Sequence, residues 1–227
     1  MRAALSVVIP TLNAASVLPA CLAALMEGLE AGLIRELVIS DGGSDDATLQ
    51  IAEATGAVVV KGAASRGGQL RRGAHVAGGG WLLFLHADTV LPAGWANAVS
   101  AQFEQGGPAA FRLSFDATGP MPQLVAGWAN LRSRMLGLPY GDQALLIPRA
   151  TYDVAGGYAD IPLMEDVAMA RALKGRISVM PLAVTTSSAR YRREGWVRRG
   201  ARNLWTLIRY LCGTDPVQLA KAYRRKR

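Results

Sequence analysis

Short apolar runs alternate with longer helical patterns over roughly the first ninety residues of the chain. The runs are rich in Val, Ile and Leu and cover residues 5–10, 36–40, 57–61 and 81–86, with Ala-rich segments between them. Such alternation predicts βαβ units on a buried parallel sheet. Because each connection has room for a right-handed crossover helix, the carboxyl ends of the four strands should meet at one edge of the sheet. Open α/β sheets bind their ligands at that edge.

The regular alternation of predicted strands and helices ends beyond residue 110. The elements predicted there are a strand over 111–115, helices over 121–136 and 149–154, a strand over 140–147, a helix over 163–173, a hairpin-like region over 177–187, and helices over 195–211 and 216–224. Glu165 and Asp166 fall in the first turn of one of these helices, where capping by itself accounts for one of the two carboxylates. The pattern as a whole predicts an α/β fold with a mixed, mostly parallel sheet flanked by helices.

Composition narrows the class of protein. A chain of 227 residues has room for one substantial core, so we expect one α/β domain over 1–189 and a helical extension over 190–227 packed on it. No apolar run reaches the roughly 18 to 20 residues that crossing a bilayer requires, and the first run stops at Pro10, before a signal-type core is complete. Cys21 and Cys212 lie far apart, which favours two reduced thiols. These features predict a cytoplasmic protein.

The net charge of +8 is concentrated at one end of the chain. Residues 190–227 contain 12 Lys and Arg against Glu194 and Asp215, whereas residues 1–189 contain 13 against 15. A solvated basic helix explains this tail as well as a contact with phosphate groups or an anionic membrane does. The tail carries no motif for reading bases, so no nucleic acid is expected as a partner.

The same tail has an amphipathic pattern. Trp196, Leu204, Trp205, Ile208 and Leu211 recur at helical spacing, with arginines among them. This pattern is most typical of a helix that packs on its own core. It is also typical of a helix that lies on an anionic membrane, which predicts a peripheral contact at the inner membrane face.

Polar clusters follow the first two predicted strands. Pro10, Thr11 and Asn13 come after the first strand, and Asp41 and Gly42 open a turn rich in Gly and Asp after the second. Glycines let the backbone approach a ligand closely, and an aspartate at a strand end can accept a hydrogen bond from a base or ribose. Taken alone, the second cluster is more typical of a plain turn before an N-capped helix.

Two further clusters bear charge. Arg66 and Gly67 precede a helix, where phosphate binds readily, although the motif alone is weak. His86 and Asp88 end an apolar strand two residues apart, on one side of the chain. One aspartate together with a diphosphate can hold Mg2+ or Mn2+. The other interpretation is a structural histidine and a helix cap.

The order and spacing of these pieces resemble family 2 glycosyltransferases of the GT-A fold over almost the whole chain. The motifs that carry the resemblance are SVVIPTLN, VISDGGSDDAT, FLHAD, YGDQALLIPR and PLMEDVAMARAL. It is closest to small single-domain members that are associated with radical-SAM enzymes and proposed for arsenosugar biosynthesis. The resemblance implies a Rossmann-like GT-A fold and an inverting transfer of a sugar from a nucleotide-diphosphate donor to a small-molecule or lipid-linked hydroxyl, with Mg2+ or Mn2+ as cofactor.

Residue roles follow from this resemblance. Asp166 is the implied base, and Glu165 is the weaker candidate because adjacent helix residues point about 100° apart. Asp88 and His86 are the implied metal ligands. The implied donor-binding residues are Pro10, Thr11, Asn13, Asp41, Gly42, Arg66, Gly67, Ala87 and Arg190, and the implied acceptor-binding residues are Gly141, Asp142 and Gln143.

The chain departs from the family pattern at two places. His86 replaces the first acidic residue of the usual DxD motif, which leaves the identity of the metal open. Residues 188–192 replace the QxxRW of processive relatives, which argues against polysaccharide synthesis. Arg192 is equally well explained as a diphosphate ligand or as a solvated surface residue.

Other classes of protein fit less well. A nicotinamide oxidoreductase would need GxGxxG after the first strand, where Pro10, Thr11, Leu12 and Asn13 stand instead. A nucleotidyltransferase would need a Gly-rich basic loop there to hold a triphosphate. A non-catalytic nucleotide- or membrane-binding protein remains the third alternative.

Overall fold

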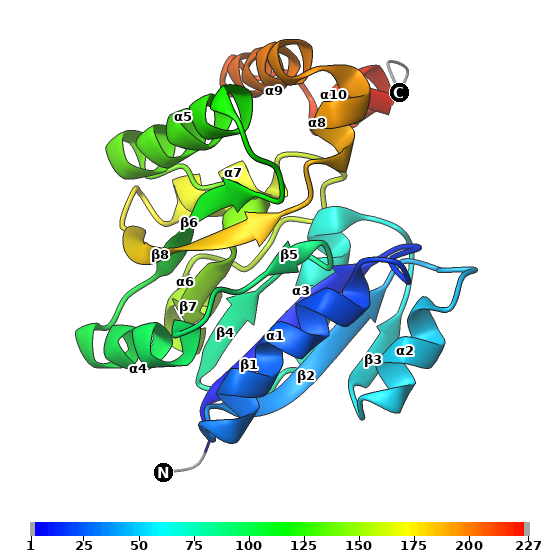
Figure 1. Ribbon diagram of the computed structural model, residues 1–227, viewed down its shortest axis with the longest axis vertical. Coiled ribbons are helices and arrows are strands. Elements are labelled where there is room, and N and C mark those ends of the chain that lie inside the picture. The colour runs from blue at the N-terminus through cyan, green and yellow to red at the C-terminus, as the bar shows by residue number, and fades with distance from the viewer. Residues whose placement is uncertain (1–2, 225–227) are drawn as a thin grey trace.

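The computed structural model describes residues 3–224 and has an eight-stranded mixed sheet at its centre, covered by helices on both faces (Figure 1). The strands are β1 (Leu5–Thr11), β2 (Ile34–Asp41), β3 (Val58–Lys61), β4 (Trp81–Phe84), β5 (Thr89–Val90), β6 (Ala109–Phe115), β7 (Leu145–Pro148) and β8 (Ser178–Thr186). The helices are α1 (Leu18–Glu30), α2 (Thr48–Ala54), α3 (Arg66–Val76), α4 (Trp95–Gln105), α5 (Pro120–Leu136), α6 (Arg149–Val154), α7 (Glu165–Ala172), α8 (Ala189–Glu194), α9 (Trp196–Leu211) and α10 (Pro216–Arg224), with a 3-10 turn η1 (Gly141–Gln143).

Strand order explains where the site lies. The order is β3-β2-β1-β4-β7-β6-β8-β5, and β1 to β4 pair in parallel. β7 runs antiparallel to both β4 and β6, whereas β6 and β8 are parallel. The carboxyl ends of the first four strands therefore meet at one edge, as predicted, and the mixed α/β sheet is confirmed.

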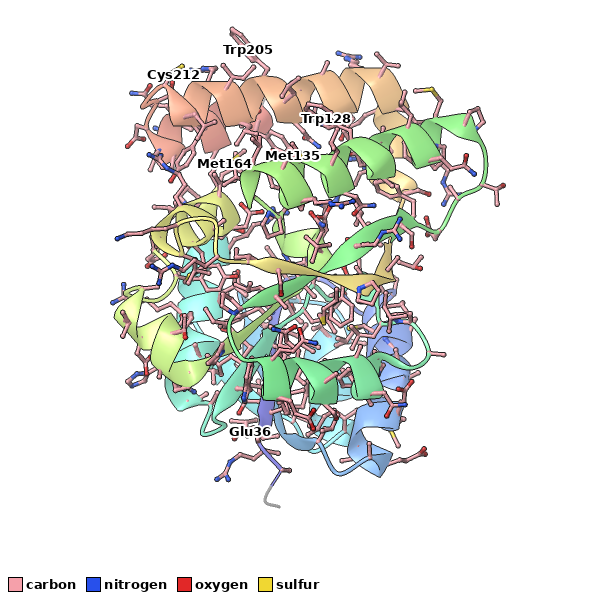
Figure 2. All side chains as sticks on the ribbon, turned by 90° about the vertical axis from the view of Figure 1, so that its left-hand side faces the viewer. Glu36, Trp128, Met135, Met164, Trp205 and Cys212 are labelled. Carbon is pink, nitrogen blue, oxygen red and sulfur yellow. The ribbon has the colours of Figure 1, made fainter. Side chains whose placement is uncertain are left out.

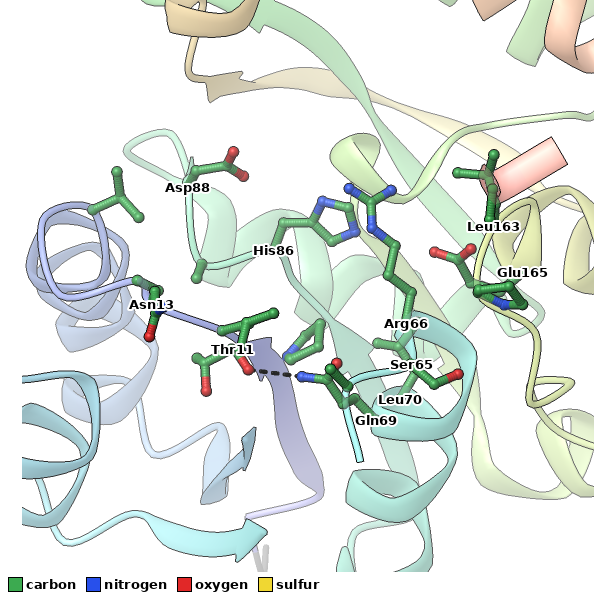
Figure 3. A pocket seen from close by; sticks show the side chains of 18 of the residues that line it. Thr11, Asn13, Ser65, Arg66, Gln69, Leu70, His86, Asp88, Leu163 and Glu165 are labelled. Atoms are coloured by element: carbon green, nitrogen blue, oxygen red, sulfur yellow. Dashed lines mark hydrogen bonds between the residues drawn. The ribbon is translucent and has the colours of Figure 1, made fainter. Parts of the chain in front are cut away.

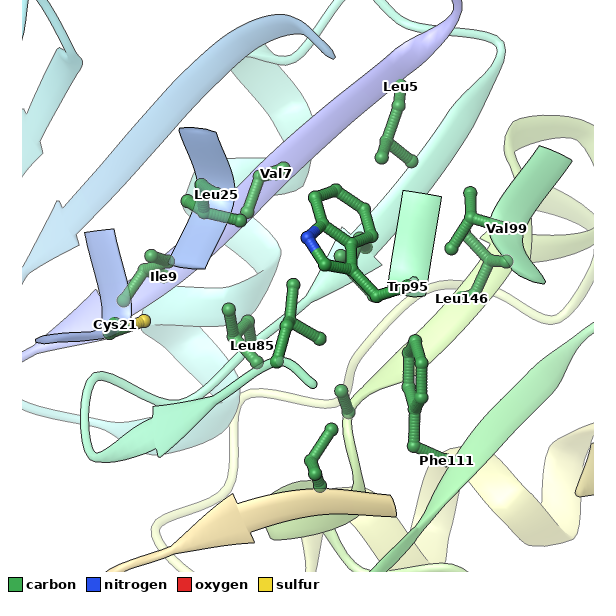
Figure 4. Packing of buried hydrophobic residues seen from close by; sticks show 14 of the residues in the cluster. Leu5, Val7, Ile9, Cys21, Leu25, Leu85, Trp95, Val99, Phe111 and Leu146 are labelled. Carbon is green, nitrogen blue, oxygen red and sulfur yellow. The ribbon is translucent and has the colours of Figure 1, made fainter. Parts of the chain in front are cut away.

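Alternate residues of β1 face two different cores. Leu5, Val7 and Ile9 point toward α1 and α4, and Val8 points toward α3, α6 and α7. Trp95 of α4 fills the centre of the first core, as Figure 4 shows. Burial on both faces explains why these strands are continuous apolar runs.

The basic tail folds back over the sheet's second half. α9 packs beside α5, and α10 packs against α9, at the upper end of the molecule in Figure 1. Leu207 and Leu219 of the tail share a small core with Met164 and Val167 at the start of α7. Among the described helices, none is both long and apolar enough to cross a membrane. Cys21 and Cys212 are both free, as expected.

Three of the predicted elements are wrong. Residues 140–147 are not one strand, because Gly141–Gln143 forms the turn η1 before β7 begins. The hairpin-like region predicted over 177–187 is instead one long strand, Ser178–Thr186, between β6 and β5. β4 ends at Phe84, so His86 and Asp88 lie in the loop that follows the strand. α7 begins at Glu165, two residues later than predicted, and the acid pair still occupies its first turn.

Candidate active site

Two adjoining cavities lie at the carboxyl edge of the strands. The larger cavity has a volume of about 330 Å³ and extends from the end of β1 to α10. The smaller cavity has a volume of about 120 Å³ and lies between η1, α7 and the tail. Both are lined by the same seven residues, Arg66, His86, Asp88, Leu163, Glu165, Arg190 and Tyr223. A ligand in one cavity therefore touches the walls of the other.

Asp41 organises the loop at the mouth of the larger cavity. Its carboxylate accepts hydrogen bonds from the Thr11 hydroxyl at 2.9 Å, from the Gly43 and Ser44 amides at 2.8 Å each, and from the Ser44 hydroxyl at 2.5 Å. Burial opposes ionisation, but these hydrogen bonds outweigh it and lower the pKa of Asp41. Asp41 is fully buried and does not line either cavity. In this structure it shapes the loop, because its oxygens are occupied by its own chain.

Gln69 of α3 fixes the ends of two strands. Its side-chain amide donates to the Thr11 carbonyl at 2.7 Å and to the Ser40 carbonyl at 3.0 Å, at the floor of the larger cavity (Figure 3). The Ser65 hydroxyl caps the same helix by accepting from the Gly68 amide at 3.3 Å. These contacts hold α3 in one position against β1 and β2.

Close packing at the start of α3 directs Arg66 into the cavities. A Cβ on Gly67 would lie 1.9 Å from the Ala159 carbonyl oxygen, so only glycine fits there. Figure 3 shows the Arg66 side chain rising between His86 and Glu165. Burial opposes its charge, but Glu165 and Asp166 outweigh this and raise the pKa of Arg66, so it stays cationic.

His86 and Asp88 project from the loop after β4 into both cavities. Burial, together with the charge of Arg66, lowers the pKa of His86 to about 4, so the imidazole is neutral at pH 7. The Nε2 atom of His86 is close to the backbone of Gly141, where a Cβ would lie 2.6 Å away. Within residues 3–224, the Asp88 carboxylate makes no hydrogen bond or ion pair, which leaves its oxygens open to a ligand.

The acid pair follows a strained residue. Met164 has φ +67°, a left-handed conformation that is costly for a side chain of this kind and that is typical of functional sites. Asp166 accepts hydrogen bonds from the Gly141 amide at 2.8 Å and from the Val167 amide at 2.7 Å, and it lines the smaller cavity. Burial and the charge of Asp166 raise the pKa of Glu165 to about 7, and its Oε2 atom has no hydrogen-bond partner. The two neighbours thus have different surroundings.

The predicted acceptor residues divide between cavity and core. Asp142 lines the smaller cavity, burial raises its pKa to about 6, and its Oδ1 atom is buried without a partner. Gln143 is fully buried and turned inward, where its amide donates to the Phe111 carbonyl at 3.0 Å and accepts from the Ser133 hydroxyl at 2.6 Å. Gln143 therefore supports η1 from behind.

Tail residues complete the wall, and sequence analysis did not single them out. Tyr223 of α10 lines both cavities, and its hydroxyl accepts from Arg199 and donates to Asn203, at 3.1 Å each. Tyr191 lines the smaller cavity, next to Arg190, which lines both. The only sequence signal for these residues was the neighbouring Arg190-Tyr191-Arg192 motif.

Most of the predicted site residues meet at the two cavities, but four do not. Asp41, Gly42, Gly67 and Gln143 lie behind the lining, where they position the residues that form it. Arg192 is exposed and also lies outside both cavities, and its charge acts on Asp116 instead. Of the three predicted site aspartates Asp41, Asp88 and Asp166, only Asp88 and Asp166 line the same cavity.

Asp88 and His86 fit a divalent metal that is held partly by the protein and partly by a phosphate-bearing substrate. In the described part of the chain, no three His, Cys, Asp or Glu side chains are grouped closely enough to hold a metal without help. Asp88 and the neutral His86 supply one carboxylate oxygen donor and one nitrogen, next to two arginines. Mg2+ and Mn2+ are commonly bound by one or two carboxylates together with substrate phosphates.

Comparison with known proteins identifies the family. The family model described as "Glycosyl transferase family 2" matches residues 6–142, more than half of the chain. The chain belongs to glycosyl transferase family 2. The expected family and enzyme class, a glycosyltransferase, are confirmed at this level.

Curated relatives match a shorter part of the chain. The PGL/p-HBAD biosynthesis glycosyltransferases of Mycobacterium bovis and Mycobacterium tuberculosis are 41% identical over 93 residues, which is 38% of this chain and 36% of theirs. The chain thus aligns with little more than a third of the length of these relatives.

Solved structures share the fold. TarS 1-349 of S. aureus in complex with UDP has a TM-score of 0.64 and 20% identity, covering 81% of this chain and 60% of that one. Glucosyl-3-phosphoglycerate synthase from Mycobacterium tuberculosis in complex with Mg2+ and UDP has a TM-score of 0.56 and 20% identity, covering 81% and 69%. At this level of identity the likeness establishes the GT-A fold.

Proposed function

We propose that this glycosyltransferase moves a sugar from a nucleotide-diphosphate donor to an acceptor hydroxyl, with inversion at the anomeric carbon. The observation that carries the proposal is the junction of the two cavities, where Arg66, Asp88 and Arg190 meet Glu165, while Asp166 lines the smaller cavity next to it. A donor in the larger cavity and an acceptor in the smaller one would place their reacting atoms at this junction.

The larger cavity suits the donor. Pro10, Thr11 and Asn13 line its β1 end, where the nucleoside would lie. Arg66 and Arg190 lie farther along, where charge-assisted hydrogen bonds to a diphosphate are strongest. Structures with the same fold contain UDP or UDP-GlcNAc in TarS, and UDP-glucose with Mn2+ in glucosyl-3-phosphoglycerate synthase, which supports a nucleotide-sugar donor.

Asp88 and His86 would hold a divalent metal against the diphosphate. A metal bound there supplies Lewis-acid stabilisation of the charge that develops on the leaving group. Arg66 and Arg190 add fixed positive charge at the same place, and such preorganised electrostatics contribute much of the rate enhancement in enzymes.

Asp166 is the proposed general base. Its two amide hydrogen bonds orient the carboxylate, which lines the smaller cavity. An acceptor hydroxyl there would lose its proton to Asp166 as the oxygen attacks the anomeric carbon from the face opposite the diphosphate. A single displacement of this kind inverts the configuration. Asp142 can bind another acceptor hydroxyl through its unpaired oxygen.

The wider assignments are also proposals. We assign residues 1–189 to the transferase domain and 190–227 to an extension that completes the acceptor side. The LLFLHADT, PYGDQ and PLMEDV motifs support the subgroup associated with radical-SAM enzymes and arsenosugar biosynthesis. Two free cysteines support a place in the cytoplasm.

A donor screen tests the proposal. The full chain is incubated with a panel of nucleotide sugars and Mn2+, and release of nucleoside diphosphate is measured with and without EDTA. We expect nucleoside diphosphate to be released from one donor, and we expect this release to stop when EDTA chelates the metal.

Asp166→Asn should lower turnover by at least about 100-fold while leaving binding of the nucleoside diphosphate unchanged in calorimetry. The exposed Asp153→Asn should behave as wild type. Full activity of Asp166→Asn would exclude it as the base, and full activity in EDTA would exclude the metal.

A further inference from the structure

A broad apolar face covers the end of the molecule that carries the tail. Ten of the seventeen exposed large hydrophobic side chains of residues 3–224 lie on α5 and α9. They are Leu124, Trp128, Leu131, Met135 and Leu136 on α5, and Val197, Leu204, Trp205, Ile208 and Leu211 on α9. We call this set the α5–α9 face. Contiguous exposed apolar surface on this scale marks an interaction site.

Helical spacing aligns these residues into two stripes. On α5, Leu124, Trp128, Leu131 and Met135 recur every three or four positions, so they share one side of the helix. Met135 is 71% exposed and Trp128 is 50% exposed, while Ala126 and Ala129 on the other side of α5 are buried. The exposed side of α5 is therefore mostly apolar, unlike the polar face expected of a solvated surface helix.

The second stripe continues the first. Val197, Leu204, Ile208 and Leu211 share one side of α9, and Trp205 beside them is 62% exposed. Figure 2 shows Trp205 pointing away from the protein at the top, with Trp128 at the boundary between the two helices. Trp128 and Leu204 line one shallow groove of about 40 Å³, so the two stripes form one surface.

Basic side chains border this face. At about 100° per residue, Arg198 and Arg209 lie along one flank of the α9 stripe. The exposed Arg134 lies beside the α5 stripe. Arg199 and Arg202 point inward instead, where both bind Glu194. The charge that borders the apolar stripes is therefore positive.

We propose that the α5–α9 face docks on an anionic membrane surface. An apolar stripe with tryptophans, bordered by arginines, is the pattern of a helix that lies in the interface of such a membrane. The balance of +10 over residues 190–227 complements an anionic bilayer, and it disfavours pairing with a second copy of the same basic surface. Docking goes beyond sugar transfer and does not depend on it.

The groove gives the docked protein an orientation. Tyr140, Asp142, Tyr191 and Asn203 line both the groove and the smaller cavity. A membrane in contact with the α5–α9 face therefore lies at the groove that adjoins the acceptor side. This consequence rests on the proposed function, because only that function makes the smaller cavity an acceptor site.

Vesicle binding tests the docking. The full chain is mixed with vesicles of phosphatidylcholine alone or with added phosphatidylglycerol, and sedimentation is measured at low and high salt. We expect binding to the anionic vesicles only, weakened by salt. Arg198→Glu with Arg209→Glu should weaken binding by more than about tenfold, since each basic residue near such a surface contributes about fivefold. Leu29→Ser with Lys61→Glu changes exposed residues outside the α5–α9 face and should bind as wild type.

Tryptophan fluorescence tests the orientation. Brominated lipids should quench Trp128 and Trp205. The double variant Trp128→Phe with Trp205→Phe should lose the quenching while it keeps its melting temperature, because Trp81 and Trp95 pack in the core and Trp196 packs against Phe115 and Tyr191. Three outcomes would overturn docking: no vesicle binding, equal binding of the arginine variant, or a dimer in sedimentation that the tryptophan variant abolishes. None of these depends on turnover, so sugar transfer is judged separately.

Discussion

At the residue scale, two adjacent carboxylates have different environments. Glu165 is buried with one unpaired oxygen and lies near Arg66. Asp166 is held by two amides and faces the smaller cavity. Sequence analysis predicted this pair and preferred Asp166, because adjacent helix residues cannot both face one ligand squarely. It could not predict the proton affinity of Glu165, which depends on burial.

The raised pKa of Glu165 predicts how stability changes with pH. Its value rises from 4.5 to about 7 on folding, so the folded state holds this proton more tightly than the unfolded state does. The free energy of unfolding should therefore fall as pH rises from 4.5 to 7, by about 3 kcal/mol. Glu165→Gln lacks this loss and should gain stability relative to wild type over that range.

Urea unfolding below pH 4.5 and above pH 7 measures the difference. The exposed Glu104→Gln serves as control for the removal of one glutamate charge. If the difference between Glu165→Gln and wild type is constant with pH, the Glu165 carboxyl is not buried as described.

At the element scale, hydrogen bonds from buried glutamine side chains, rather than strand pairing, fix the elements that surround the site. Gln69 ties α3 to the ends of β1 and β2. Gln143 performs the same task for η1 and β6. The family resemblance implied an acceptor role for Gln143, because a polar residue beside Asp142 gives no sign that it points inward. Only its packing against α5 decided the direction.

Two buried glutamines allow a matched comparison. Gln69 and Gln102 are each 5% exposed, and each donates to two backbone carbonyls. Changing either to Met removes two hydrogen bonds to backbone carbonyls and should cost about 1–3 kcal/mol of stability. Only Gln69→Met should weaken donor binding, by about tenfold, which corresponds to about 1.4 kcal/mol. Chemical denaturation measures the loss of stability, and calorimetry measures the donor affinity. Equal donor affinity in both variants would contradict the role of Gln69 in positioning α3.

At the scale of the whole molecule, the tail is part of the active site. Leu219 packs with Met164 and Leu207 and so fixes α10, whose Tyr223 lines both cavities. The strained Met164 immediately precedes the acid pair. The wall of the site and the acid pair thus depend on the same small core.

Truncating Leu219 should therefore affect stability and kinetics together. Leu219→Ala should cost about 2–5 kcal/mol and raise the KM for the donor, because α10 and Met164 lose a common support. Leu5→Ala creates a cavity in the core beside α1, where Leu5 is as buried as Leu219. This variant should lose similar stability, and its KM for the donor should be unchanged. Steady-state kinetics well below both melting temperatures separate the two. Equal KM values in both variants would show that the tail does not shape the donor site.

The sequence by itself determined the βαβ half of the molecule and the chemistry at its edge. Apolar periodicity is local, and parallel strands that end in Thr11, Asp41 and Phe84 must place their polar successors together. Only the folded structure shows that Asp41 turns inward, that Ser178–Thr186 forms one strand and that Tyr223 reaches the site. Each of these depends on contacts between segments far apart in the chain, and local patterns of hydrophobic and polar residues carry no record of such partners.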